Sequence, residues 1–200
     1  MKYLIIFSII LSFIPSCTIE DKCNLSNLDI YLKDKKLSHK KLLYNSNFLS
    51  YTESTIFDNG HIYFYRKYKL TKSFSELDKH NFRIRNIVYR ISDQNGTIVR
   101  EECQYQKPTN FNRKWVRNLS CKDKTIILSK KRWAVGKGEF ASTCHIKTAK
   151  NKVVFGKKRK IIKAICKSKY GDIIVYYAEG LGVIKSSEGS TYTTLVKILG

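Results

Sequence analysis

The chain has 200 residues, with 38 Lys or Arg against 16 Asp or Glu, so its formal net charge at pH 7 is +22. Hydrophobic residues make up 42% and aromatic residues 12% of the chain, which excludes a disordered polar tail and is enough for one globular domain. None of the six cysteines forms a C-x-x-C pair, which excludes the ligand spacing of a zinc ribbon and the motif of a thioredoxin-like site.

The first residues, MKYLIIFSIILSFIPSC, have the pattern of an export signal. One lysine precedes an apolar run from Leu4 to Ile14, and this run is much shorter than the roughly 20 residues that a membrane-spanning helix needs. We therefore expect residues 1–16 to be a cleaved signal peptide. Loss of its single lysine lowers the formal net charge of the mature chain from +22 to +21.

Cys17 is the candidate site of a lipid anchor. Ile14 and Ser16 fit the branched and small positions of the bacterial lipobox, whereas Pro15 does not. With a lipid on Cys17, we expect a protein of the periplasm or outer membrane whose partner is the membrane itself; without it, we expect a secreted protein. Lipidation leaves Cys23 without a cysteine partner, whereas an unmodified Cys17 is free to pair with Cys23 or with another cysteine.

Residues 17–45 are polar and rich in lysine, which predicts a tether followed by a first weak strand or short helix. Residues 46–200 are predicted to form a single antiparallel β domain. Alternation with period two predicts a hairpin of residues 48–57 and 61–70 around Asn59-Gly60, and a second hairpin of residues 82–92 and 97–106 around Asn95-Gly96.

Residues 71–81, between these hairpins, are the best candidate for a short helix, because Ser73 and Glu76 have the spacing of a capping box. A change of alternation near Asn86 predicts a β-bulge. Shorter strands separated by glycines are predicted at residues 111–119, 125–135, 139–149, 159–169, 172–178, 183–186 and 191–199. The predicted fold is mainly β: a curved antiparallel sheet or half-open barrel with one short helix, after the cleaved N-terminal signal helix.

Four cysteines fall within consecutive predicted strands. In an oxidising compartment disulfides are the default, although six cysteines allow 15 pairings. The positions favour local cross-strand bridges between Cys103 and Cys121 and between Cys144 and Cys166. Each closes a loop of about 20 residues, which corresponds to roughly 3 kcal/mol in the chain-entropy model.

Residues Ala134–Ile146 read AVGKGEFASTCHI, and residues Tyr176–Lys185 read YYAEGLGVIK. The first segment resembles a "v-x-v-P-A-G-x-F-x-x-C" strand–turn–strand and the second a closing "W-Y-A-x-G-v-G-x-V-K" hairpin. Both recur in uncharacterised bacterial envelope proteins, many of them lipoproteins. The resemblance implies a curved antiparallel sheet akin to that of the lipoprotein-localisation carriers LolA and LolB, and it carries over no catalytic group.

The glycines of these two segments are predicted to be turn residues. Gly136 and Gly138 belong to the first motif, which this chain departs from at Lys137, where the family usually has a small residue. Gly180 and Gly182 flank the turn of the second motif, where backbone must be presented without side-chain clash.

The sequence contains no clear pattern of a catalytic site or a metal site. A secreted ribonuclease would use two histidines and a lysine, but no recognised motif surrounds any histidine. Cys144 and His145 are adjacent on a predicted strand and point to opposite faces, as do Glu101 and Glu102, so neither a metal site nor a glycosidase pair is indicated. We expect no enzyme, no cofactor and no metal. The histidines are His39, His61, His80 and His145.

The strong positive charge favours anionic partners. For an exported protein these are anionic envelope surfaces rather than nucleic acid, and the basic-aromatic segments are typical of core aromatics beside solvated lysines. We expect a non-enzymatic exported envelope protein that binds lipid or an anionic envelope component, with a protein partner also open. The alternative is a secreted inhibitor or immunity-type protein that binds an acidic partner through its basic face.

Overall fold

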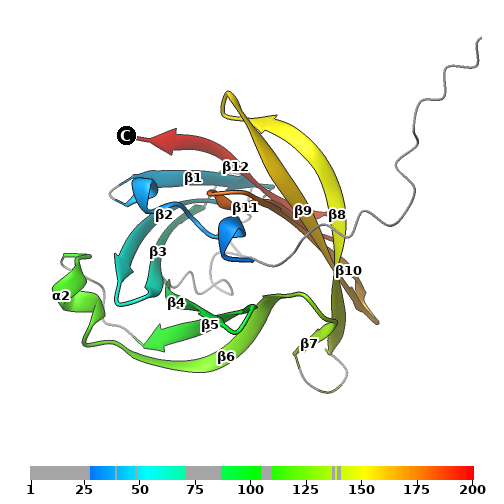
Figure 1. Cartoon of the computed structure of the whole chain (residues 1–200), viewed down its shortest axis with the longest axis horizontal. Helices are drawn as coiled ribbons and strands as arrows, with labels where there is room; N and C mark the ends of the chain where they lie inside the picture. The colour runs from blue at the N-terminus through cyan, green and yellow to red at the C-terminus, as the bar shows by residue number, and fades with distance from the viewer. Residues whose placement is uncertain are drawn as a thin grey trace, which may run out of the picture.

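In the computed structural model, twelve strands form one antiparallel sheet that curls into a nearly closed barrel (Figure 1). The structure describes residues 28–38, 40–47, 49–70, 87–104, 110–136, 138 and 141–200. The predicted fold class, a curved antiparallel sheet or half-open barrel with one short helix, is confirmed. The predicted signal peptide 1–16, Cys17 and Cys23 lie outside the described residues.

The sheet consists of two meanders joined edge to edge. Strands β1 to β6 pair in chain order, strands β7 to β12 do the same, and β1 pairs with β12, with Tyr44 opposite Leu195. The strands are β1 (Lys41–Ser46), β2 (Leu49–Asp58), β3 (His61–Leu70), β4 (Ile87–Gln94), β5 (Thr97–Gln104), β6 (Ser120–Ser129), β7 (Trp133–Val135), β8 (Ser142–Val154), β9 (Lys157–Ser168), β10 (Gly171–Ala178), β11 (Gly182–Glu188) and β12 (Thr191–Leu199).

The barrel has a seam where β6 and β7 meet. These two strands end the strand order, and they lie beside one another (Figure 1). The single strand predicted over residues 125–135 is therefore wrong: it is divided between β6 and β7, with a break at residues 130–132. At this break the chain passes from β6, the strand at one end of the sheet, to β7, the strand at the other end.

Side chains alternate between the barrel interior and its outer face, as period two requires. Ile62 and Phe64 of β3 point inward and lie opposite Ile91 and Tyr89 of β4. The main core joins residues from both meanders and from the N-terminal segment. Its buried members are Leu28, Tyr31, Ile62, Phe64, Tyr89, Ile91, Ile98, Leu128, Trp133, Cys144, Ile162, Ala164 and Tyr177.

The short helix α2 (Arg113–Val116) covers the outer face of β2 and β3. Val116 packs there against Ile56 and Tyr63. The strand predicted over residues 111–119 is thus wrong. The Asn112 side chain accepts a hydrogen bond from the Trp115 backbone N–H at 2.9 Å, and this N-cap favours a helical turn over an extended strand.

Two 3₁₀ turns, η1 (Leu28–Tyr31) and η2 (Lys35–Leu37), precede β1. Residues 17–45 are predicted to be a tether and a first weak element. Their described part contains these two turns and then enters β1, a strand of the sheet. The predicted helix over residues 71–81 and the bulge near Asn86 lie outside the described residues. Among the residues that are described, no helix is long and apolar enough to cross a membrane.

Both predicted disulfides are confirmed, and they lie on opposite faces of the sheet. Cys103–Cys121 joins β5 to β6, and Cys144–Cys166 joins β8 to β9. Cys144 is fully buried in the main core, directly opposite Trp133 in the β7–β8 ladder. The second bridge therefore faces the barrel interior.

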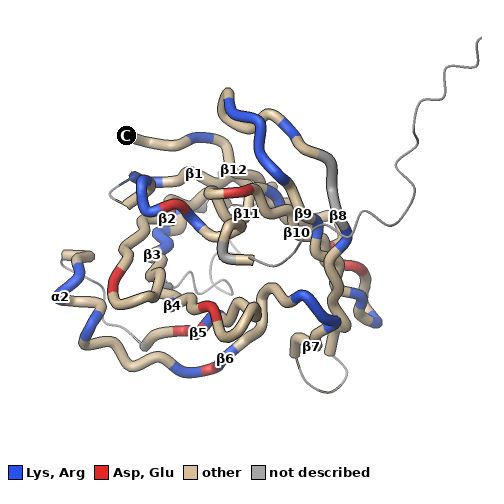
Figure 2. The backbone as a smooth tube through the Cα atoms, viewed as in Figure 1, with Lys and Arg blue, Asp and Glu red and all other residues tan. Residues whose placement is uncertain are grey.

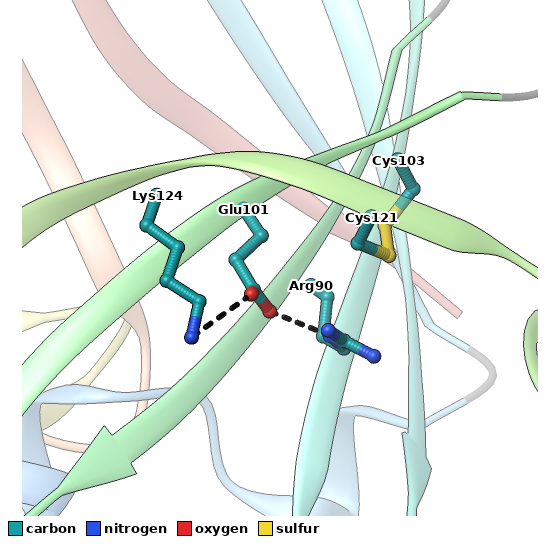
Figure 3. Close-up of a disulfide and its surroundings, with 5 residues drawn as sticks. All are labelled: Arg90, Glu101, Cys103, Cys121 and Lys124. Carbon is teal, nitrogen blue, oxygen red and sulfur yellow. Dashed lines mark hydrogen bonds and ion pairs between the residues drawn. A yellow bond between two sulfur atoms is a disulfide. The ribbon is translucent and has the colours of Figure 1, made fainter.

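The Cys103–Cys121 bridge lies on the outer face beside an ion-pair cluster (Figure 3). Glu101 of β5 lies between Arg90 of β4, whose Nε is 2.6 Å from the carboxylate, and Lys124 of β6, whose Nζ is 3.7 Å from it. The hydrogen bond from Arg90 lowers the pKa of Glu101. This cluster and the disulfide together tie three neighbouring strands.

Replacing each disulfide by a pair of alanines tests the different roles of the two bridges. The bridges span 18 and 22 residues, so loss of either should cost about 3 kcal/mol of unfolding free energy. We expect C144A/C166A to cost more than C103A/C121A, because it leaves a cavity in the main core, to which the buried Cys103 does not belong. Urea unfolding of both variants measures this, and an equal or smaller loss for the inner bridge would contradict its placement.

Candidate functional site in the barrel

The N-terminal segment Leu28–Asp34 runs into the barrel interior and is fastened to the turn between β10 and β11. Leu28 and Tyr31 are buried in the main core. The backbone N–H of Gly180 donates to the carbonyl of Ile30 at 2.7 Å, and the N–H of Asp34 donates to the carbonyl of Gly180 at 3.0 Å. The segment thereby carries Lys33 into the interior.

The predicted turn glycines at 180 and 182 permit this close approach. Gly180 has φ +69°, and a Cβ there would lie 3.2 Å from Nη1 of Arg159 and 3.6 Å from Cβ of Asp34. Gly182 has φ +74°, and a Cβ would lie 3.5 Å from Cγ of Lys33. The hairpin motif therefore serves to seat the N-terminal segment, a role that its sequence does not reveal.

A buried carboxylate, Glu53 of β2, is the centre of the interior polar cluster. Its carboxylate accepts hydrogen bonds from Lys33 Nζ and from Arg66 Nε of β3, the latter at 2.5 Å. Lys33 Nζ also lies 3.3 Å from Oγ1 of Thr55. The side chains of Glu53 and Lys33 are each only 2% exposed. Two cations thus surround one anion in the interior.

Aromatic rings surround this cluster and face its cations. Lys33 Nζ lies 4.3 Å from the ring centroid of Phe64, and the Arg66 guanidinium lies 5.1 Å from that of Tyr51 and 5.2 Å from that of Tyr89. A cation over a ring face is attracted by the ring quadrupole, more strongly when water is excluded. The rings therefore stabilise the positive charge that Glu53 leaves unbalanced.

The same contacts determine the pKa of Glu53. Burial by itself would raise the pKa, but the charges of Lys33 and Arg66 and their hydrogen bonds lower it to about 2. Burial likewise raises the pKa of Tyr177, to about 12. A general acid or base at neutral pH needs a pKa near 7 and an accessible proton site. A carboxylate bound by two cations is instead suited to holding the barrel together.

Little space remains around the cluster. The cavity beside Glu53 has a volume of about 80 Å³ and is lined by polar and aromatic side chains, among them Tyr44, Arg66, Arg100 and Tyr177. Ligand pockets typically measure about 300–1,000 Å³, so this cavity fits a few water molecules rather than an acyl chain.

A larger hollow opens at the mouth of the barrel. It measures about 490 Å³ and lies between the N-terminal segment, the β2–β3 turn and β4. Lys35, Arg113 and Asp93 line it and are exposed, and His61 also faces it. Asp58 in its wall is bound by Arg117 through two hydrogen bonds, at 2.8 and 2.7 Å. The hollow has the volume and the cationic groups of a site for a small anionic ligand.

The buried acidic side chains are engaged with the protein's own cations. Glu53, Asp58 and Glu101 are buried, and each is bound by at least one Arg or Lys. Most lysines of the described residues are exposed, and blue positions recur along both meanders, whereas red positions are few (Figure 2). The net positive charge of the chain therefore lies mainly on the outer surface.

The remaining residues singled out from the sequence lie apart. Gly136 and Gly138 have positive φ values of 82° and 60° and belong to the connection between β7 and β8. His145 is half-buried on β8 and His61 is at the mouth, whereas His39 and His80 lie outside the described residues. Across the described residues, no group of three or more His, Cys, Asp or Glu is placed to hold a metal ion.

Sequence reasoning missed the residues at the centre of the interior. Glu53 lies in the segment YTESTIF, where Tyr51, Glu53 and Thr55 share one face with Phe57. This alternation shows that Glu53 shares the face of two aromatic residues. No sequence signal connects it to Lys33, which is 20 residues earlier and belongs to no regular strand or helix.

In comparisons with known proteins, no family model matches the chain, and no curated protein or solved structure is significantly similar to it.

The variant E53Q tests the charge cluster through the pH dependence of stability. The folded-state pKa of about 2 lies below the unfolded value, so Glu53 stabilises the fold above pH 5, and this contribution is lost as the pH falls towards 2. At pH 7 we expect E53Q to lose about 3–5 kcal/mol, because Lys33 and Arg66 lose their anion. Urea unfolding between pH 7 and pH 2 should show this difference shrinking in acid.

The control is E188Q, which removes an exposed carboxylate at the end of β11. It should change the unfolding free energy by no more than about 0.5 kcal/mol at any of these pH values. A loss for E53Q that is small at pH 7, or that does not decrease in acid, would contradict the ionised state of Glu53.

Proposed function

We propose that the protein is a non-enzymatic exported protein of the bacterial cell envelope, held at a membrane through a lipid on Cys17. The observation that carries this proposal is the pair of disulfides, Cys103–Cys121 and Cys144–Cys166. Disulfides form and persist in oxidising compartments outside the cytosol. The export pattern of residues 1–16 and the lipobox-like residues before Cys17 agree with such a compartment.

The proposed activity is binding of a small anionic envelope component at the mouth of the barrel. Three observations support it. The cavity beside Glu53 measures only about 80 Å³, the mouth hollow measures about 490 Å³, and the exposed cations Lys35 and Arg113 line that hollow. The resemblance of the closing hairpin to that of envelope lipoproteins supports the location in the envelope.

An acidic protein partner is the second candidate. It is favoured by the basic outer surface, on which exposed lysines outnumber exposed carboxylates. Association with such a partner would be steered by charge and would weaken steeply as salt is raised. A pull-down from envelope extracts at low and high salt, repeated after removal of membranes, separates a protein partner from a membrane component.

Mass spectrometry of the mature protein from bacterial membranes tests the proposal. We expect an N-terminus at Cys17 that carries the mass of a lipid, and cross-linked peptides for the two disulfides. C17S should lack the lipid and be released from the membrane fraction by a high-salt wash, whereas C23S, the matched control, should keep the lipid and resist that wash. A mature protein with an unprocessed N-terminus or reduced cysteines at 103, 121, 144 and 166 would refute export.

A further inference from the structure

The hairpin of β8 and β9 concentrates the positive charge of the chain. Residues 142–168 contain nine basic residues and no Asp or Glu, so they contribute +9 to a net charge of +22. Figure 2 shows this as blue stretches on both strands of the hairpin without red. The basic residues are Lys147, Lys150, Lys152, Lys157, Lys158, Arg159, Lys160, Lys163 and Lys167.

The tip of this hairpin exposes apolar side chains. Val153 is 72% exposed and Phe155, in the turn, is 42% exposed. Phe155 and Gly156 are the two turn residues, and the turn projects at the edge of the molecule (Figure 1). Lys158 lies opposite Val153 on the same face of the hairpin, and Lys152 and Lys157 flank the turn in sequence; all three lysines are exposed. An exposed valine and phenylalanine have no counterpart in the polar turns at Asn59-Gly60 and Asn95-Gly96.

The position of the tip is determined by contacts on its other face. Val154 packs against the buried cluster that contains Ile161 and Leu181. Nη1 of Arg159 donates to the carbonyl of Glu179 at 2.5 Å. Both contacts attach the hairpin to the β10–β11 connection, so Val153, on the opposite face of β8 from Val154, points away from the barrel.

We propose that the tip of the β8–β9 hairpin inserts into the surface of an anionic phospholipid bilayer. Val153 and Phe155 would enter the boundary between head groups and acyl chains, and the surrounding lysines would contact the anionic head groups. Apolar side chains gain by leaving water, and each lysine close to an anionic membrane strengthens binding about fivefold. Charge and apolar surface coincide at this tip.

The apolar side chains favour a bilayer over a soluble polyanion. A wall polymer is bound through its charges, and a nucleic acid through its charges and through stacking of its bases on aromatic rings such as Phe155. An exposed valine contributes little to either contact, whereas a bilayer binds apolar and cationic side chains together. The bilayer therefore explains Val153 and Phe155 together with the lysines, whereas a polyanion leaves Val153 without a role.

This inference rests on the proposed anchoring of the protein at a membrane. A lipid on Cys17 would attach the chain 11 residues before Leu28, and a fully extended chain of that length spans at most about 40 Å. The anchor would thus keep the barrel close to the bilayer and raise the effective concentration of the hairpin there. The tip adds a second contact that restricts how the barrel is oriented.

The test is vesicle binding by the full mature chain with C17S, which removes the lipid and leaves the hairpin as the binding element. We expect binding to vesicles of mixed phosphatidylcholine and phosphatidylglycerol, and at least about tenfold weaker binding to phosphatidylcholine alone. V153S/F155S should weaken binding to the anionic vesicles about tenfold or more. K152Q/K157Q/K158Q should weaken it by about a hundredfold.

The matched control is K41Q/K67Q/K131Q, which removes three exposed lysines from other parts of the barrel. It should retain more of the binding than K152Q/K157Q/K158Q. All substituted side chains are exposed, and thermal unfolding checks that each variant is folded. F155W gives an independent readout, because its added emission should shift to shorter wavelength with anionic vesicles.

Three results would overturn the inference. The first is that V153S/F155S binds as tightly as the parent, which would mean that the lysines contact a polyanion without insertion. The second is an equal loss for both lysine triples, which would mean that the charge acts diffusely. The third is that the C17S chain does not bind anionic vesicles. None of these results removes the lipid anchor itself, which depends on the mass at Cys17.

Discussion

The buried carboxylate of Glu53 is the constraint on which the rest of the barrel depends. An ionised carboxylate in an interior of low dielectric is costly unless it is paired and hydrogen-bonded. Arg66 supplies one partner from the neighbouring strand, and Lys33 supplies the other from outside the sheet. Because Lys33 precedes β1, its pairing requires the N-terminal segment to enter the barrel and to pack beside the β10–β11 connection.

This arrangement determines where the molecule is able to bind other molecules. The N-terminal segment, the aromatic rings and the charge cluster lie in the interior, where the cavity beside Glu53 measures about 80 Å³. The larger hollow lies at the mouth, and the strongest concentration of lysines lies on the β8–β9 hairpin. The buried acidic side chains pair with Arg90, Arg117 and Arg66. The outer surface is basic because exposed lysines outnumber exposed carboxylates. The barrel is thus suited to outward recognition of anions.

Most of the fold is contained in local sequence patterns. Alternation around the two Asn-Gly turns predicts the β2–β3 and β4–β5 hairpins, and the spacing of cysteines within strands predicts both disulfides. These features depend on residues close together in the sequence, so a local reading finds them. The helix at Arg113–Val116 escapes such a reading because its single turn depends on the Asn112 cap and on packing against β2 and β3.

The interior cluster of Lys33, Glu53 and Arg66 could not be predicted from the sequence, for a different reason. Its members come from β2, from β3 and from a segment without regular structure, and only the closed barrel brings Lys33 to Glu53. The role of Gly180 is equally non-local, since its turn contacts residues nearly 150 positions earlier. The seam between β6 and β7 also follows from closure of the whole sheet, and no pattern within residues 125–135 marks it.

Hydrogen exchange at two backbone amides tests most directly whether the N-terminal segment is locked inside the barrel. These are the amide of Gly180, bonded to the carbonyl of Ile30, and the amide of Asp34, bonded to the carbonyl of Gly180. If the segment is locked, both amides should exchange as slowly as those of the central strands β2 and β3. Exchange at the rate of an exposed loop, with β2 and β3 still protected, would contradict it.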